Sequence, residues 1–167
     1  GRELWRFEER EAHSAAGRPV VGGGIVYIPA GFGKAGLLAI KLGGSGVLAE
    51  TDLAWRYKKG TPQKPSVTLV GDSLFFVNDA GIANCLDAKT GEVVWTERVG
   101  GNFSASPLFA DGKFWACNEE GKVVVFAASR KFEKLAENTL ADGFMASPAV
   151  SDGALYLRSK TSLYRLE

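Results

Sequence analysis

The sequence predicts an all-β fold in which one four-stranded antiparallel unit recurs four times. The first indication is a repeat of a little over forty residues, marked by Pro19, Pro65, Pro107 and Pro148. The second is turn chemistry, because Asp-Gly, Gly-Asp or Glu-Glu-Gly separate short apolar runs, as in β-hairpins. The third is that runs such as KFWAC and VVVFA are apolar at nearly every position, so both faces of each sheet should be buried. A β-propeller satisfies all three, because each blade is packed between two neighbours.

Each of the four blades should contribute strands A to D in chain order, within a single domain of residues 1–167. In the third blade these strands are expected at 105–110, 113–118, 122–128 and 133–139. The D strands are marked by Trp5, Trp55, Trp95 and Leu135, and a long C–D loop, GGSGVLAETD, precedes Trp55. The blades are expected at about residues 18–57, 64–98, 105–139 and 146–167.

The first seven residues, GRELWRF, resemble the last strand of the second unit, GEVVW. The fourth unit ends after its third strand, so we expect residues 1–7 to complete the last blade and protect its edge. Within one chain this would close a four-bladed ring. Between two copies it would close an eight-bladed ring as a homodimer, which is a common closed assembly. A half-propeller from a longer chain is the third alternative.

Composition excludes several classes of function. A net charge of +1, from 20 basic and 19 acidic residues, does not indicate a nucleic-acid binder. The longest apolar runs, such as VVVFAA, are far too short to span a membrane. The only histidine, His13, excludes a metal site built from several histidines, and no other metal site is predicted. Cys85 and Cys117 lie in apolar runs, which favours buried free thiols and leaves their oxidation state open.

The stretch LDAKTGEVVW resembles the tryptophan-docking signature of the pyrroloquinoline-quinone-like (PQQ-like) β-propeller repeat family. The matching residues are Asp87, Thr90, Gly91 and Trp95. The resemblance implies that the Asp-x-x-Thr-Gly turn joins strands C and D, and that the tryptophan packs against a neighbouring blade. It extends over nearly the whole chain, but only the second blade carries the complete signature.

The family includes quinone-dependent dehydrogenases and exported scaffold proteins, so the resemblance implies two functions. The dehydrogenases carry two adjacent cysteines and acidic and amide calcium ligands, and this chain has no adjacent cysteines. We therefore expect a non-catalytic binding or scaffold module, with no cofactor, a protein or peptide partner, and a periplasmic or extracellular location. The alternative is part of a quinoprotein-type oxidoreductase whose cofactor residues lie in a missing half.

In a four-stranded blade the D–A links and the B–C loops emerge on one side, which we call the loop face. Ligand sites of propellers usually lie there. One of these loops, AGFGKAG, is not a phosphate loop, because Ile28 and Ala35 replace the required Gly and Ser or Thr. The candidate partner-binding residues on the loop face are His13, Arg18, Gln63, Lys64, Asn102, Phe103, Ser104, Phe144 and Met145.

Overall fold

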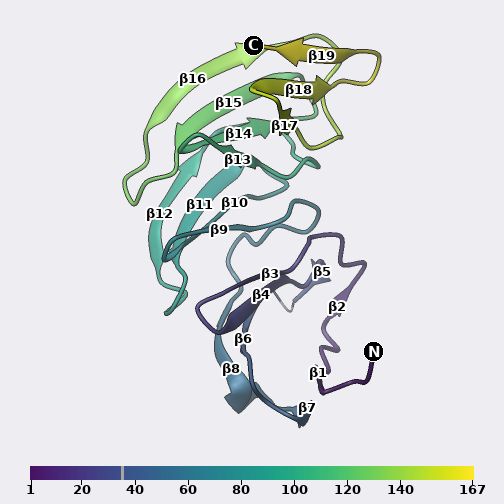
Figure 1. Ribbon diagram of the computed structural model, residues 1–167, viewed down its shortest axis with the longest axis vertical. Coiled ribbons are helices and arrows are strands. Elements are labelled where there is room, and N and C mark those ends of the chain that lie inside the picture. The colour runs from purple at the N-terminus through teal and green to yellow at the C-terminus, as the bar shows by residue number, and fades with distance from the viewer. Residues whose placement is uncertain (35) are drawn as a thin grey trace.

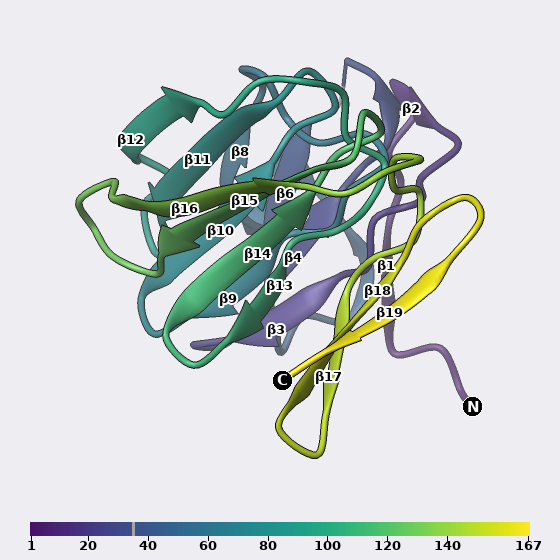
Figure 2. The same ribbon diagram turned by 90° about the horizontal axis from the view of Figure 1, so that it is seen from above.

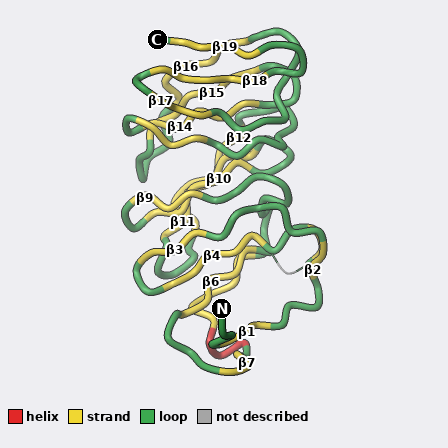
Figure 3. The backbone as a smooth tube through the Cα atoms, turned by 45° about the vertical axis from the view of Figure 1, so that its right-hand side comes forward, coloured by secondary structure: helices red, strands yellow, loops and turns green. Residues whose placement is uncertain are grey.

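The computed structural model describes residues 1–34 and 36–167, so Ala35 of the AGFGKAG loop lies outside the described residues. These residues form four consecutive blade sheets stacked in an arc, together with two short two-stranded sheets. The two termini lie at opposite ends of the stack (Figure 1). Strands alternate with short loops throughout, and a 3₁₀ turn at Glu50–Asp52 lies near the N-terminal end (Figure 3). None of the helical segments in the described ranges has the length and apolar character that crossing a bilayer requires.

Every blade is an antiparallel meander in which sequential strands are neighbours. Blade 1 contains β3 (Val20–Gly22), β4 (Ile25–Pro29), β6 (Leu37–Lys41) and β8 (Leu53–Tyr57). Blade 2 contains β9 (Thr68–Val70), β10 (Ser73–Val77), β11 (Ile82–Asp87) and β12 (Val93–Arg98). Blade 3 contains β13 (Leu108–Ala110), β14 (Lys113–Cys117), β15 (Lys122–Ala127) and β16 (Lys134–Thr139). Blade 4 contains three strands, β17 (Ala149–Ser151), β18 (Ala154–Arg158) and β19 (Leu163–Leu166).

The A–B hairpins have the turn residues that their geometry requires. Asp111 and Gly112 have φ angles of 49° and 69°, and Asp152 and Gly153 have φ angles of 50° and 76°. Two consecutive positive φ values define the tight turn whose twist matches that of the flanking strands. Asp and Gly tolerate this conformation better than other residues, so the Asp-Gly pairs act as turn residues here.

The core of the described residues contains four clusters. Three of them lie between successive blades, and the fourth lies on the outer face of blade 1, against the N-terminal segment. The first joins β4 and β6 to β10 and β11, the second joins β10 and β11 to β14 and β15, and the third joins β14 and β15 to β18. The sheets fan out face to face when the stack is viewed along its long axis (Figure 2). Sheets with two buried faces, as the apolar strands predicted, are therefore confirmed for the two middle blades.

Both cysteines lie in these inter-blade clusters as free thiols. Cys85 lies between blades 2 and 3, and Cys117 lies between blades 3 and 4. Burial raises the pKa of Cys85, and it raises the pKa of Cys117 to about 12. Neither thiol is in the reactive thiolate form near neutral pH.

The predicted position of the N-terminal strand is wrong for the single chain. β1 (Trp5–Phe7) pairs in parallel with β7 (Gly46–Leu48), next to blade 1, and not with blade 4. Trp5 and Phe7 pack against the apolar face that blade 1 turns away from blade 2. Covering that face buries apolar surface near the strand, whereas blade 4 lies at the far end of the stack, so the ring does not close (Figure 1).

Candidate functional site

The turn between β11 and β12 is held by Asp87. Its Oδ1 atom accepts hydrogen bonds from the backbone N–H groups of Lys89 and Thr90, at 3.0 and 3.2 Å. Gly91 adopts a φ of +74° and donates its N–H to the Asp87 carbonyl. This Asx-type turn fixes the backbone shape of the C–D connection.

A tryptophan of the preceding blade docks on this turn. The Trp55 indole N–H donates to the carbonyl of Ala88 at 2.9 Å. A Cβ atom at Gly91 would lie 2.6 Å from Cδ2 of Trp55, so only glycine leaves room for the ring. Gly91 is therefore needed both for its positive φ and for the docked indole.

Trp95 repeats this arrangement one blade further along. Its indole N–H donates to the carbonyl of Ser129 in the C–D turn of blade 3, at 2.9 Å. The ring lies 6.0 Å from Phe75 and 5.1 Å from Phe132, measured between ring centroids. Trp95 is thus an inter-blade contact with its polar group satisfied.

The two docking turns are also joined by charge. Arg130 of blade 3 reaches back to Asp87, with 3.2 Å between Nη1 and Oδ2. Burial acts to raise the pKa of Asp87, but the N–H groups of Thr90 and Lys89 and the Arg130 guanidinium outweigh it. The net effect holds the pKa of Asp87 below its usual value of 3.8.

The loop face brings together four of the candidate residues. Lys64 lies 3.2 Å from Oε1 of Glu119 and 3.7 Å from Oδ1 of Asp79, so it bridges blades 2 and 3. Ser104 donates its hydroxyl to the same Glu119 oxygen at 2.5 Å. The backbone N–H of Gln63 donates to Oδ2 of Asp79 at 2.7 Å.

The fourth of these residues, Asn102, caps the neighbouring acid. Its side-chain amide and its backbone N–H both donate to Glu120. The Ser104 hydroxyl and the Lys64 ammonium lower the pKa of Glu119, and the Asn102 donors lower that of Glu120. The face therefore carries ionised carboxylates in fixed positions at neutral pH.

Asp79, Glu119 and Glu120 were not among the residues selected from the sequence. A usable signal was present, because Asn-Asp-Ala-Gly and Asn-Glu-Glu-Gly occupy matching B–C turns. In both turns the Asn side chain organises the loop: Asn78 and Asn118 each accept two backbone N–H bonds through Oδ1. The acids follow directly, so their direction is set by the turn.

The remaining candidates do not join this cluster. Phe103 and Phe144 are fully buried between blades, so their rings cannot contact a partner at the surface. Their apolar side chains already indicated core positions in the sequence. Met145 is exposed. Arg18 begins a chain of hydrogen bonds that runs from blade to blade. Its backbone N–H donates to the hydroxyl of Ser66. The N–H of Ser66 donates in the same way to Ser106, and the N–H of Ser106 donates to Ser147.

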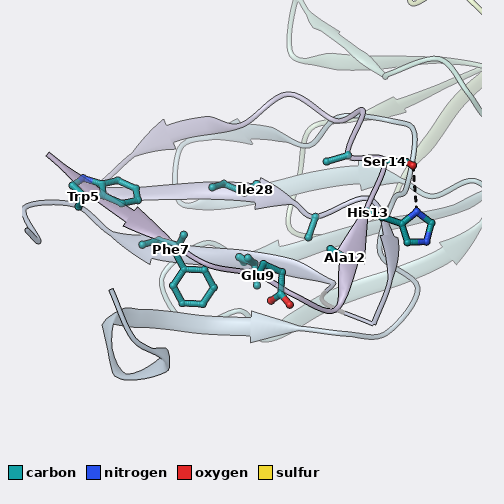
Figure 4. Close-up of a pocket in the computed structure, with 11 residues that line it drawn as sticks. Trp5, Phe7, Glu9, Ala12, His13, Ser14 and Ile28 are labelled. Carbon is teal, nitrogen blue, oxygen red and sulfur yellow. Dashed lines mark hydrogen bonds between the residues drawn. The ribbon is translucent and has the colours of Figure 1, made fainter. Parts of the chain in front are cut away.

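His13 belongs to a separate pocket of about 370 Å³ under the N-terminal segment (Figure 4). Its ring stacks on Phe32, and Nδ1 lies 3.2 Å from the Ser14 hydroxyl. Trp5, Phe7 and Ile28 give the pocket an apolar lining, and Glu9 contributes a carboxylate. In the part of the chain that the structure describes, no group of three or more His, Cys, Asp or Glu side chains could hold a metal ion.

Comparisons with known proteins agree with this geometry. Residues 46–131 match the PQQ_2 family, described as outer membrane protein assembly factor BamB. A search of curated proteins gave no significant match.

Solved structures share the fold at low identity. BamB from Moraxella catarrhalis has a TM-score of 0.66 at 15% identity, over 89% of this chain and 41% of that chain. Quinohemoprotein alcohol dehydrogenase ADHIIG from Pseudomonas putida HK5 has a TM-score of 0.72 at 15% identity, over 92% and 29%. The computationally designed Ika4 protein has a TM-score of 0.74 at 12% identity, over 100% and 99%.

This chain thus spans about two fifths of the BamB chain. The family match covers more than half of the chain and includes the Asp87–Trp95 motif. The chain therefore belongs to the PQQ-like β-propeller repeat family, whose matching family model is described as outer membrane protein assembly factor BamB.

Proposed function

We propose that this chain is a non-catalytic scaffold module that binds a protein or peptide partner on its loop face. The observation that carries the proposal is the charged network of Lys64, Asp79, Ser104 and Glu119, which spans the junction of blades 2 and 3. A surface whose charged groups are already held in place loses little side-chain freedom when a partner binds. Such a surface suits recognition of a polar partner.

The backbone beneath the network is equally constrained. The N–H of Phe103 donates to the Asp79 carbonyl, and the N–H of Glu119 donates to the Asn102 carbonyl. Each D–A link is therefore bonded to the B–C turn beside it. This supports a rigid binding face, with partner specificity set by the alternation of carboxylates and an ammonium group.

The test is site-specific photocrosslinking in extracts of the source organism, with the photoreactive residue at Gln63. We expect a specific adduct that is lost in the Lys64→Glu variant. It should persist in Lys89→Glu, a matched charge reversal in a turn on the opposite side of the blades, provided that both variants melt cooperatively. Adducts that survive Lys64→Glu unchanged would contradict the loop-face assignment.

The enzymatic alternative is tested separately. The chain is titrated with pyrroloquinoline quinone and calcium, and visible absorbance is recorded. We expect no saturable change. A stoichiometric absorbance shift would overturn the scaffold proposal.

As part of this proposal, two copies pair head to tail and close an eight-bladed ring. The support is the position of β1, since Trp5-Arg6-Phe7 repeats Trp55-Arg56-Tyr57 of β8. Trp5 and Phe7 pack on blade 1 as Trp55 and Tyr57 pack on blade 2. β1 thus lies where the D strand of a preceding blade would lie, and light scattering should give about twice the 17.8 kDa of one chain.

A further inference from the structure

The face of each blade that turns toward the next blade has a recurring pair at its centre. An aromatic residue of strand B lies opposite a small apolar residue of strand C. The pairs are Tyr27 with Ala39, Phe75 with Cys85, and Trp115 with Val125. Ala39, Cys85 and Val125 are at most 3% exposed, which is expected for positions in a blade–blade contact.

Blade 4 keeps the aromatic residue and changes its partner. Tyr156 lies opposite Arg165, whose Nε donates to the tyrosine hydroxyl at 3.2 Å. At the end of strand B, Arg158 occupies the position held by Val77 and Cys117 in blades 2 and 3. Both arginines are exposed. An apolar blade packed directly on this face would bury two guanidinium groups, so its natural partner must supply carboxylate.

The opposite end of the stack offers such a surface. The 370 Å³ pocket is floored by Ile28, Leu38 and Ile40, on the face that blade 1 turns away from blade 2. Glu9 lines this pocket, with 16% of its side chain exposed. Its Oε2 lies 2.7 Å from Arg56 and its Oε1 accepts the N–H of Glu11. The backbone N–H of Arg10 also acts on this carboxylate. Because a carboxylate offers about four acceptor sites, these bonds still leave capacity for a second guanidinium.

The repeat geometry places Glu9 against Arg158. After blades 2 and 3, the first residue of the D–A link bonds the B–C turn of its own blade: Val99 donates to Gly81, and Leu140 donates to Gly121. Glu9 stands four residues after Trp5, as Val99 stands four residues after Trp95. If β1 is the D strand of a preceding blade, Glu9 lies at the B–C turn of that blade. In blade 4 that turn begins directly after Arg158.

We propose that the pocket beneath the N-terminal segment receives Tyr156 and Arg158 from blade 4 of a second copy, with Arg158 paired to Glu9. The ring of Tyr156 covers the apolar floor, and the guanidinium meets the carboxylate at the loop-face end. The contact cannot form within one chain, because the two surfaces lie at opposite ends of the stack (Figure 1). This inference rests on the proposed pairing of two copies and names the contact that joins them.

The test uses two charge reversals in the full chain, analysed by light scattering and analytical ultracentrifugation. Arg158→Glu and Glu9→Arg should each weaken self-association, by about 30-fold or more, because each places like charges across both junctions. Mixing the two variants should restore a dimer, since both junctions of the mixed pair then join opposite charges. Lys131→Glu, a reversal in an exposed turn of blade 3, should associate like the unmodified chain.

The outcomes separate the two levels of the proposal. A monomeric unmodified chain at about 100 μM, a concentration at which specific pairs persist, would overturn the pairing itself. A dimer that is insensitive to Arg158→Glu would overturn this contact and leave the pairing standing. Failure of the mixed variants to associate, with both folded by circular dichroism, would also contradict the Glu9–Arg158 pair.

Discussion

The junctions between blades 1 and 2 and between blades 2 and 3 differ from the junction between blades 3 and 4. In the first two, Trp55 and Trp95 dock on the C–D turn of the next blade through indole N–H bonds. In the third, Ala136 holds the register of Trp95, opposite Val125 of strand C, and is exposed. The D-strand position expected at Leu135 is therefore one residue early. The space nearby remains open as a cavity of about 380 Å³ lined by Trp115, Leu157 and Leu166.

This difference shows that two separate interactions hold neighbouring blades together: burial of apolar strands and docking of a tryptophan. All three junctions bury apolar strands B and C, including Phe114 and Phe126 at one junction and Leu157 at another. Only the first two add an aromatic wedge with a specific polar bond. Apolar burial alone suffices to stack the blades. The tryptophan fixes the position of each blade relative to the next.

The largest expected effect comes from removing a wedge. Trp95→Ala should lower the free energy of unfolding by roughly 3–5 kcal/mol, because it removes the indole from among Phe75, Phe126 and Phe132. Urea denaturation followed by circular dichroism measures the change. The truncation Leu135→Ala, at an exposed position of blade 3 next to the equivalent Ala136, should cost no more than about 0.5 kcal/mol. Equal losses in the two variants would remove the distinction between the junctions.

A change in the dock should come next in size. Gly91→Ala forces a Cβ atom into a position 2.6 Å from the Trp55 ring, at a φ of +74°. We expect a loss of roughly 2–3 kcal/mol from steric displacement and backbone strain. In the Trp55→Ala background the same substitution should cost about 1 kcal/mol less, because the ring is gone and the strain remains. If Gly91→Ala costs the same free energy of unfolding with and without Trp55, the effects are additive, and Trp55 does not dock on Gly91.

Asp87→Asn should have a smaller effect that depends on pH. At neutral pH it should cost about 1 kcal/mol, because it removes the charge that Arg130 and two N–H groups stabilise. The folded-state pKa of Asp87 lies below the unfolded value of 3.8. The stabilisation is therefore complete above about pH 4 and is lost as the pH falls through the folded pKa. Denaturation curves at several pH values should show variant and parent converging in acid; a constant gap would contradict the assignment.

The repeated strands and docking turn could be predicted because local residues determine them. The prolines mark the period, the Asp-Gly pairs form the hairpins, and Asp87 with Gly91 forms the C–D turn. The position of β1 could not be predicted in the same way. Its pattern correctly indicates a strand, but which edge that strand occupies depends on tertiary distance, and the face of blade 1 is nearer.

The loop face shows the same limit. Topology predicted that Lys64 and Ser104 would share a face, and the structure joins both to Glu119. Topology does not determine whether a link residue points outward, so Phe103 and Phe144 were included although they are buried. Asp79, Glu119 and Glu120 were missed because acids in these turn sequences were interpreted only as residues that shape the backbone.

The two cysteines allow the most direct test of the central claim, that tryptophan wedges hold their junctions more firmly than apolar burial alone. Cys85 lies in the cluster between blades 2 and 3, and Cys117 lies between blades 3 and 4; they are 0% and 1% exposed. Single-cysteine variants, Cys117→Ala and Cys85→Ala, are labelled with a thiol reagent in denaturant below the unfolding transition, where the rate reports local opening. We expect Cys117 to react faster than Cys85, because its junction lacks a wedge. Equal rates, or faster labelling of Cys85, would contradict the account.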